Sequence, residues 1–576
     1  MRSKISCAMV ALWVLASFLT VRTVFAHENE LSLSPINRQF QEYMDLVRAR
    51  KAPELKTAEK YYLGLIPAPL DMSHTRGLRV IPEAKRVTYP ASYDLRTLGC
   101  LTPIKDQGSC GSCWAFATYG SLESWILGEE GATWDFSENN FKNCHGFTLT
   151  GCQGGNRLIS TAYLARWNGP IDEADDPYHP YEEVCTPGLE VKKHVETVLM
   201  IPDRASSTDN DNIKQAVMNY GAMYTGMYYS SYYYNDVNHT YYYSGTDYSN
   251  HAVAIVGWED NFDRTLFNSP YPPGNGAWIV RNSWGTDWGE SGYFYISYYD
   301  SRIGTDNALF INAEEPGEPS DYSIYQYDPL GNVLDVGYGT TTAWGANVFT
   351  VASDKKLTSV AFYAATVGTS YEVYIYDTFS GGIFSGLWGS KTGTLTHPGY
   401  HTVSLNSPVS LTMADDFGVV VKFTTPGYIY PIPIEYPEPG YSDAATANPG
   451  ESYVSYNGIY WRDITDSYSN TNVCIKAIAG PVRPSPDLTG VIVYPNPFKP
   501  AVGHTRITFA ALTQRVTIRI FNIAGELVEK QDVSGQYSWD WDVKNTDEEE
   551  LARGVYIWVV TNAAGEKRTG KIAIIK

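Results

Sequence analysis

A glycine-rich turn that runs into a cysteine and then into a helix-like segment is the strongest chemical signal in the sequence. Residues 107–117 read QGSCGSCWAFA, and apolar residues continue the pattern through Leu122, Trp125 and Ile126. A cysteine in the first turn of a helix faces unpaired N–H groups and the positive end of the helix dipole, which favour the thiolate. The pattern predicts a nucleophilic sulfur at Cys113.

A nucleophilic cysteine needs a base and a group that orients the base, and two later segments offer them. His251 stands at the entry of an apolar, β-branched run, which predicts a buried strand that would fix its ring. Asn282 lies in the segment WIVRNSWG, where Trp284 could shield an amide–imidazole hydrogen bond from water. We therefore expect His251 and Asn282 to lie beside the sulfur.

These groups meet the requirements of acyl transfer to sulfur. The side-chain amide of Gln107, six residues before Cys113, could join the Cys113 backbone N–H as an oxyanion hole. A thiolate–imidazolium pair of Cys113 and His251 would attack a peptide carbonyl, protonate the leaving amine and release the acyl group to water. The alternative is that Cys113 is a buried thiol and His251 a core histidine.

Four motifs in order carry a resemblance to a known family. They are PASYDLR at 90–96, the cysteine motif at 107–114, CQGG at 152–155 and NSWG at 282–285, with His251 before the last of them. The stretch 88–312 thereby resembles the papain-like (C1) cysteine peptidases. The motif around Cys113 is a known signature of that family.

The resemblance implies a two-lobed α+β domain in which a helical lobe and a β-barrel-like lobe flank a groove. It implies that Cys113 is the nucleophile and that His251 is the general base and acid. It also implies that Asn282 orients His251 and that Gln107 is the oxyanion donor. The positions that it implies for substrate binding are Gly154, Gly155, Ala252 and Trp284. We expect no cofactor and no metal site.

The cysteine count supports a reactive thiol. Removal of a signal peptide that contains Cys7 leaves seven cysteines, and an odd count leaves at least one thiol outside any pairing scheme. The resemblance implies two disulfides in the helical lobe, Cys110–Cys152 and Cys144–Cys185. A further hypothesis pairs Cys100 with Cys474, which would leave Cys113 as the only free thiol.

The N-terminal region has the pattern of an exported precursor. Residues 1–26 predict a secretory signal peptide, and a membrane anchor is the weaker alternative because polar residues interrupt the apolar run before it reaches about 20 residues. Residues 27–87 predict a pro-segment, with an amphipathic helix over 34–51 and an extended, proline-punctuated stretch over 64–70. An ordinary N-terminal extension of the core is the alternative.

Three features depart from the family pattern. A loop over 259–275 separates His251 from Asn282 by 31 positions and is expected on the surface. Asn250 stands where some relatives carry aspartate, so their pH dependence does not transfer to this chain. The stretch 228–248 is crowded with tyrosine, which would either rim the groove or form an interdomain packing surface.

Beyond residue 312 the pattern changes to short alternating strands. Residues 316–480 predict an all-β sandwich and resemble the lectin-like domain that follows some prokaryotic C1 peptidases. Exposed tyrosine and tryptophan rings could stack on sugars there, although aromatic strands also arise from sheet packing. After a proline-rich linker, residues 490–576 predict a small Ig-like β-sandwich that resembles C-terminal sorting domains; an ordinary adhesive module is the alternative.

Composition limits the partners of the chain. Among 576 residues, 63 acidic and 43 basic side chains give a net charge of −20, which disfavours nucleic-acid binding, and no later segment is apolar enough to span a membrane. The sequence therefore predicts a secreted or cell-surface cysteine endopeptidase that acts on protein or peptide substrates and is made as a zymogen. The alternatives are a glycan-binding or adhesion protein with an inactive peptidase scaffold, and a transpeptidase.

Overall fold

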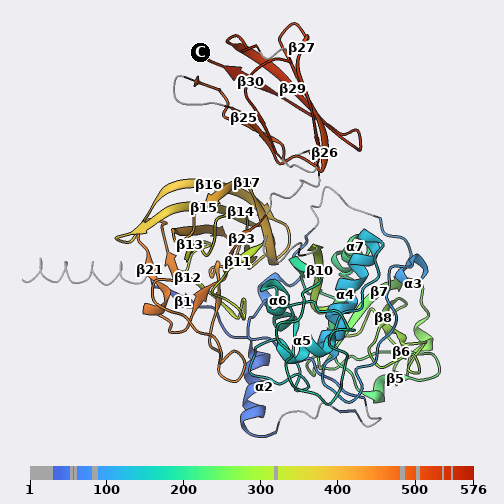
Figure 1. Cartoon of the computed structure of the whole chain (residues 1–576). Helices are drawn as coiled ribbons and strands as arrows, with labels where there is room; N and C mark the ends of the chain where they lie inside the picture. Colours follow the sequence, from blue (N-terminus) through green and yellow to red (C-terminus); the bar gives the residue numbers. More distant parts are fainter. Residues whose placement is uncertain are drawn as a thin grey trace, which may run out of the picture.

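The chain folds into two domains that lie side by side and a third, smaller β domain at the C-terminus (Figure 1). The computed structural model describes residues 30–51, 56–57, 61–80, 88–314, 316, 322–480, 487–488, 490–500, 506–534, 538–546 and 549–576. The expected signal peptide lies outside these residues.

One long helix is the centre of the helical lobe of the first domain. Helix α4 (Cys113–Glu130) is buried along most of its length and packs against α5 (Glu138–Cys144), α6 (Arg157–Ala165) and the central sheet. A helix that is apolar on nearly all sides belongs in a core. Two further helices are α3 (Leu95–Leu98) and α7 (Asp211–Tyr220).

The β lobe is a mainly antiparallel sheet that faces α4. Its strands, in spatial order, are β3 (His194–Ile201), β10 (Thr305–Glu314), β4 (Met223–Met227), β7 (His251–Glu259), β8 (Ala277–Arg281), β9 (Tyr293–Ser297), β6 (Thr240–Tyr241) and β5 (Tyr234–Asn235). Strand β2 (Ser92–Asp94) pairs with β7. The expected surface loop over 259–275 lies between β7 and β8 and is mostly exposed.

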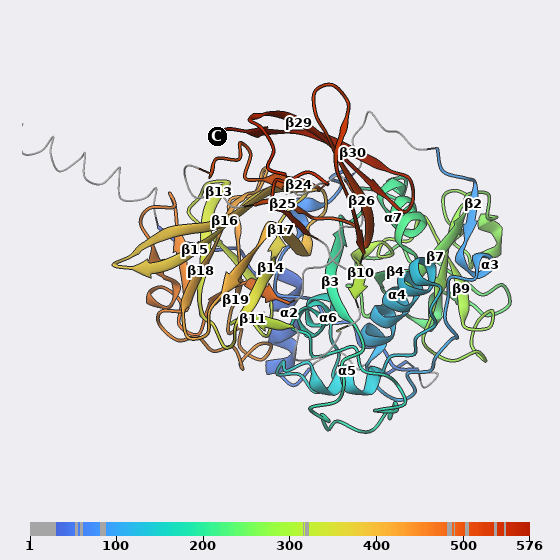
Figure 2. The same ribbon diagram turned by 45° about the horizontal axis from the view of Figure 1, so that its top comes forward.

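The first two domains share one continuous sheet. Strand β3 pairs on its outer side with β17 (Gly399–Leu411), so that Leu199 lies opposite Gly399 and Val198 opposite Tyr400. Beyond β17 the sheet continues through β14 (Lys355–Ala364), β23 (Ile475–Ala479) and β11 (Ser323–Tyr325), as Figure 2 shows for β14, β17, β3 and β10. Backbone hydrogen bonds therefore join the two domains.

The second domain is the expected all-β sandwich. A six-stranded sheet runs in the order β16 (Ile383–Leu395), β15 (Thr369–Ser380), β18 (Asp416–Thr424), β13 (Thr342–Thr350), β20 (Ser452–Ser455) and β21 (Arg462–Asp463). Its inner face packs on the shared sheet: the Phe362 ring of β14 lies 5.2 Å from Tyr371 and 5.6 Å from Phe423. A smaller sheet of the chain joins β1 (Ser32–Leu33), β12 (Leu334–Gly337), β19 (Ile432–Glu435) and β22 (Asn472–Val473).

The third domain packs two small sheets on a separate core. One sheet contains β24 (Ile492–Tyr494), β25 (Ile507–Ala510) and β28 (Trp539–Trp541). The other contains β27 (Leu527–Ser534), β26 (Arg515–Phe521), β29 (Gly554–Asn562) and β30 (Lys567–Ile574). Ile518 and Ile520 of β26 point into this core, as their alternation along the sequence predicts.

The N-terminal segment, residues 30–80, packs against the second domain at several points. Strand β1 adds to β12, and helix α2 (Arg38–Arg48) places the buried Phe40 edge-on against Tyr441, with 5.4 Å between ring centroids. Further along, the His74 ring stacks on Tyr428 at 3.8 Å. The second domain therefore anchors this segment at β1, at α2 and at His74.

The helix in this segment starts later than the sequence predicts. Asn37 is its cap, since its side chain accepts a hydrogen bond from the Gln39 N–H at 3.0 Å. Ser34 cannot cap it, because its backbone N–H donates to the Asp335 carbonyl and its hydroxyl accepts from the Asp335 N–H. The expectation of a helix from Ser34 is thus wrong by four residues at its start, because Ser34 is hydrogen-bonded to Asp335 of β12.

Candidate active site

Cys113 is the first residue of α4 and is fully buried. Its Sγ accepts a hydrogen bond from the backbone N–H of Ala252 at 3.3 Å, across the boundary between the helical and β lobes. Ala252 directly follows His251 on β7, so α4 and β7 bring the sulfur and the imidazole into one site. The long sequence separation between the two residues is closed by packing of α4 on the sheet.

The imidazole of His251 is held in a fixed orientation. Its Nε2 donates to Asn282 Oδ1 at 2.8 Å, and the same oxygen accepts the Ser283 N–H at 2.9 Å. The Trp284 ring stacks on the imidazole, with centroids 4.6 Å apart and an interplanar angle of 22°. Because Nε2 carries the proton toward an oxygen acceptor, Nδ1 is left as a free acceptor, and it has no hydrogen-bond partner among the described residues.

Burial disfavours the charged form of both groups in this conformation. Desolvation raises the pKa of Cys113 to about 12, although hydrogen bonds from backbone N–H groups, including that of Ala252, act in the opposite direction. Desolvation also lowers the pKa of His251 to about 4, against the hydrogen bond to Asn282. Desolvation therefore opposes the thiolate and the imidazolium while the strap covers the site, and the thiolate–imidazolium pair stays a prediction for the uncovered site.

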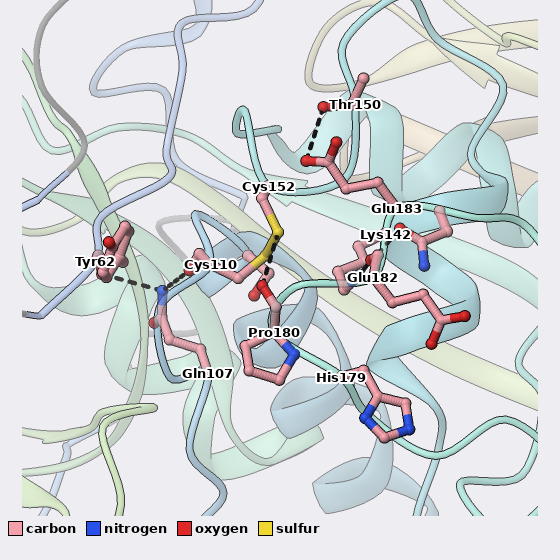
Figure 3. The surroundings of a disulfide bond; sticks show 12 residues. Tyr62, Gln107, Cys110, Lys142, Thr150, Cys152, His179, Pro180, Glu182 and Glu183 are labelled. Carbon is pink, nitrogen blue, oxygen red and sulfur yellow. Dashed lines mark hydrogen bonds between the residues drawn. A yellow bond between two sulfur atoms is a disulfide. The ribbon is translucent and has the colours of Figure 1, made fainter.

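Gln107 reaches the same site from the segment before α4. Its Nε2 donates to the carbonyl oxygens of Cys110 at 2.8 Å and Tyr62 at 3.0 Å, as Figure 3 shows. Its Oε1 accepts from the Ser283 hydroxyl at 2.7 Å, which fixes the orientation of the amide. The indole N–H of Trp284 donates to the same Tyr62 oxygen at 3.2 Å. One carbonyl of the N-terminal segment thus accepts hydrogen bonds from both Gln107 Nε2 and Trp284 Nε1.

An extended strap covers the sulfur. Residues 61–70 cross the groove, and Leu65 forms a parallel bridge with Gly155. The Gly155 N–H donates to Gly64 O at 2.9 Å, and its carbonyl accepts from Ile66 N at 3.1 Å. On the other side, the Asn250 carbonyl accepts from Leu65 N at 3.1 Å and also from Gly64 N. The groove therefore binds an extended backbone from both lobes.

Different neighbours exclude a side chain at each glycine of this groove. A Cβ on Gly154 would lie 2.8 Å from Ile66 Cγ2 of the strap, and its φ is +108°. A Cβ on Gly155 would lie 2.4 Å from the Trp114 ring. Gly154 therefore accommodates the bound chain, whereas Gly155 accommodates the domain core. A Cβ on Gly64 would collide with the Gly111 carbonyl, so the strap too needs a glycine above the α4 N-terminus.

The structure contains two disulfides and three free thiols among the described residues. The disulfides join Cys110 to Cys152 and Cys144 to Cys185. The hypothesis of a bond between Cys100 and Cys474 is wrong. Cys474 is fully buried in the second domain, whereas Cys100 lies in the first, with its sulfur 3.6 Å from the Leu98 carbonyl.

Sequence reasoning missed three contributors to the site. Ser283 orients Gln107, and its place directly after Asn282 in the NSWG motif was the available signal. The Tyr62 carbonyl accepts a hydrogen bond from the Gln107 amide, and no local sequence pattern predicts this contact. Among the crowded tyrosines, Tyr229 packs edge-on to Trp284 at 4.8 Å, so part of that stretch supports the site from within the β lobe.

Three family models match consecutive parts of the chain. Residues 89–312 match the papain family cysteine protease model, and residues 324–479 match the lectin like domain. Residues 492–576 match the secretion system C-terminal sorting domain, which indicates a secreted or cell-surface protein. Within the described part of the chain, no helix has the length and apolar character needed to cross a membrane.

Curated relatives are similar to the first domain. A viral cathepsin of Heliothis zea nuclear polyhedrosis virus is 33% identical over 222 residues, which cover 38% of this chain and 55% of that protein. Procathepsin L of Mus musculus is 31% identical over 237 residues, which cover 39% of this chain and 65% of that protein. The chain thus spans 55 to 65% of the length of these two relatives.

Solved structures are similar over the first two domains together. The cysteine protease and lectin-like domains of Cwp84, a surface layer associated protein of Clostridium difficile, match with a TM-score of 0.65 and 28% identity. That match covers 78% of this chain and 98% of the other. A Cwp84 structure after propeptide cleavage matches with a TM-score of 0.60 and 30% identity, over 68% of this chain and 99% of the other. The chain belongs to the papain family of cysteine proteases, with a lectin-like domain and a C-terminal secretion sorting domain after the protease domain.

Proposed function

We propose that the chain is a cysteine endopeptidase that hydrolyses peptide bonds and is made as a zymogen. The observation that carries this proposal is the convergence of Cys113 Sγ, the His251–Asn282 pair and the Gln107 amide around one extended backbone segment. Each group has the donor or acceptor that acyl transfer to sulfur requires. The papain-family match of residues 89–312 supports the same activity.

The mechanism follows from the orientation of the groups once the strap has left. Water and substrate then reach the site, and the free Nδ1 of His251 takes the proton of the Cys113 thiol. The thiolate attacks the scissile carbonyl, and Gln107 Nε2 together with the Cys113 N–H stabilises the oxyanion. His251 returns the proton to the leaving amine, and water hydrolyses the thioester with His251 as base.

The strap explains latency in the same terms. The Tyr62 carbonyl satisfies the Gln107 amide, and the N–H groups of Gly64 and Leu65 donate to the Asn250 carbonyl beside His251. The strap thus occupies the groove where a substrate backbone would bind. Latency also follows from burial, which disfavours the charged forms of the covered thiol and imidazole. Residues 27–87 are accordingly proposed as the pro-segment, with its removal as the activating step.

A cleavage assay with matched cysteine variants tests the activity. The full chain is processed under reducing conditions and incubated with a peptide library, and products are identified by mass spectrometry. We expect Cys113→Ala to abolish cleavage and Cys100→Ala, which removes a partly exposed free thiol of the same domain, to retain it. Equal cleavage by the Cys113→Ala chain would overturn the proposal and favour an inactive peptidase scaffold.

Two further roles are open to the same chain. A transpeptidase would use the same acyl-enzyme, and added amine nucleophiles would then appear in the products in place of water. We also propose that the lectin-like domain binds glycans. The observation that favours this is a cavity of about 420 Å³ on its six-stranded sheet, lined by aromatic rings that include Trp344, Tyr374 and Trp461.

A further inference from the structure

The outer face of the six-stranded sheet in the lectin-like domain is built as a row of rings and paired charges. Tyr374 and Tyr376 of β15 point away from the core, because Tyr371, Val373 and Ile375 alternate with them and are buried. On β13, Trp344 lies on the same outer face, opposite Lys422 of β18. The face is therefore aromatic at positions that the sandwich core does not use.

The floor of this face is formed by small residues. Ala346, Val420 and Gly418 occupy neighbouring outer positions on β13 and β18, and a Cβ on Gly418 would lie 2.4 Å from the Phe384 ring. Rings stand around this floor and enclose a cavity of about 420 Å³. Sites for small ligands are typically about 300–1,000 Å³ and mainly apolar, with a few placed polar groups. The lining residues are Trp344, Tyr374, Tyr376, Ile383, Phe384, Val420, Asn457, Gly458, Ile459 and Trp461.

Polar groups are fixed along one edge of the rings. Lys422 Nζ lies 2.7 Å from Glu372 Oε1 and 5.5 Å from the centre of the Trp344 ring. The Tyr374 hydroxyl donates to the other oxygen of Glu372. This edge therefore offers an ammonium donor and a carboxylate acceptor beside an aromatic surface, and the pair adds no net charge.

Residues 457–459 form a loop that lines another part of the cavity and is fixed by its own hydrogen bonds. The Ser455 hydroxyl accepts from Gly458 N at 2.9 Å, and Asn457 Oδ1 accepts from the N–H groups of Ile459 and Tyr460. Gly458 packs against Trp344, since a Cβ there would lie 2.9 Å from the indole nitrogen. Ile459 and Tyr460 are 66% and 68% exposed, which is unusual for large apolar side chains. A preformed, exposed apolar rim is typical of a binding site.

We propose that this cavity binds a pyranose unit of a neutral polysaccharide. A pyranose ring presents a C–H face that stacks on aromatic rings and hydroxyl groups at its edge that can reach Lys422, Glu372 and Asn457. A polyanionic glycan fits less well, because the chain carries a net charge of −20 and the lysine of the site is already paired. An apolar protein partner would have to bury the Lys422–Glu372 pair, which costs desolvation energy. The inference rests on the proposed glycan-binding role and names its site.

Binding of soluble neutral polysaccharides tests this site. The full chain with Cys113→Ala, which prevents self-cleavage, is run in affinity gels that contain yeast mannan, laminarin or galactan. Trp344→Ala and Trp461→Ala are each expected to weaken binding about 5- to 10-fold. Trp388→Ala is the matched control, because Trp388 is 38% exposed on β16 of the same domain and does not line the cavity. It should bind like the parent chain, and thermal unfolding of each variant checks its fold.

Each contrary outcome has a distinct meaning. Absence of binding to all three polysaccharides would overturn both the glycan role and this site. Binding that is unchanged in the Trp344 and Trp461 variants would overturn the site while the glycan role stands. A parent chain that dimerises in size-exclusion chromatography, with a monomeric Trp461→Ala chain, would assign the face to self-association. None of these results bears on peptidase activity, which is assayed separately in chains with Cys113.

Discussion

Replacement of Phe40 by alanine should release the pro-segment from the active site without altering any active-site residue. Phe40 is 1% exposed and packs its ring against Tyr441 of the lectin-like domain. Loss of a buried phenylalanine side chain costs about 3–5 kcal/mol. The cost falls on the docked pro-segment, because the ring is already in water when the segment is released. At about 1.4 kcal/mol per tenfold change, the open population should rise roughly 100- to 3,000-fold.

The rate at which iodoacetamide modifies Cys113 reports this population. With a Cys100→Ser background, mass spectrometry of the Cys113 peptide gives the rate directly, since Cys474 is fully buried. We expect at least a 100-fold faster reaction in the Phe40→Ala chain, by the same cost of about 3–5 kcal/mol. Leu46→Ala is the control, because Leu46 lies on the same helix and is 41% exposed. An unchanged rate in a folded Phe40→Ala chain would refute anchoring by the lectin-like domain.

Three further results follow from the same geometry. The covered His251 has a pKa of about 4 and an uncovered imidazole one near 6.5, so protons favour the open state. Modification of Cys113 relative to a free thiol should therefore accelerate as the pH falls from about 6.5 to 4, and His251→Gln should remove this acceleration. Gly155→Ala should lower the free energy of unfolding by about 1–3 kcal/mol in urea titrations, because its Cβ would meet the Trp114 ring; an unchanged midpoint would contradict that packing. In the processed chain, Gln107→Ala should reduce kcat about 100- to 1,000-fold with a smaller change in KM, and an equal loss in both would argue against an oxyanion role.

Local patterns predicted the parts of the site that depend on one element. The turn before Cys113 predicted a helix start, and α4 begins at that residue. The β-branched run after His251 predicted a buried strand, and β7 is one. Short alternating runs predicted strands beyond residue 312, and β15 has the expected two-residue period, with Tyr371, Val373 and Ile375 buried. Each of these features is encoded by neighbours within a few residues, so a single sequence is enough to read it.

Features that depend on distant parts of the chain could not be read in this way. Parity of the cysteines suggested a bond between Cys100 and Cys474, but parity carries no information on distance, and the two lie in different domains. The burial of Cys113 could not be read either, because the helix N-terminus is visible in the sequence, whereas the strap that excludes water from the sulfur is visible only in the fold. The pairing of β3 with β17 joins strands about 200 residues apart, as Val198 opposite Tyr400 shows, and no local signal marks it.

Capture of the acyl-enzyme identifies the sulfur that forms the thioester. The processed chain is mixed with a peptide ester and quenched in acid within milliseconds, and the proteolytic peptides are analysed by mass spectrometry. We expect the acyl group on Cys113 and no acyl group on the Cys113→Ala chain. Turnover of the ester with an unmodified Cys113, or with the acyl group on Cys100, would contradict this expectation.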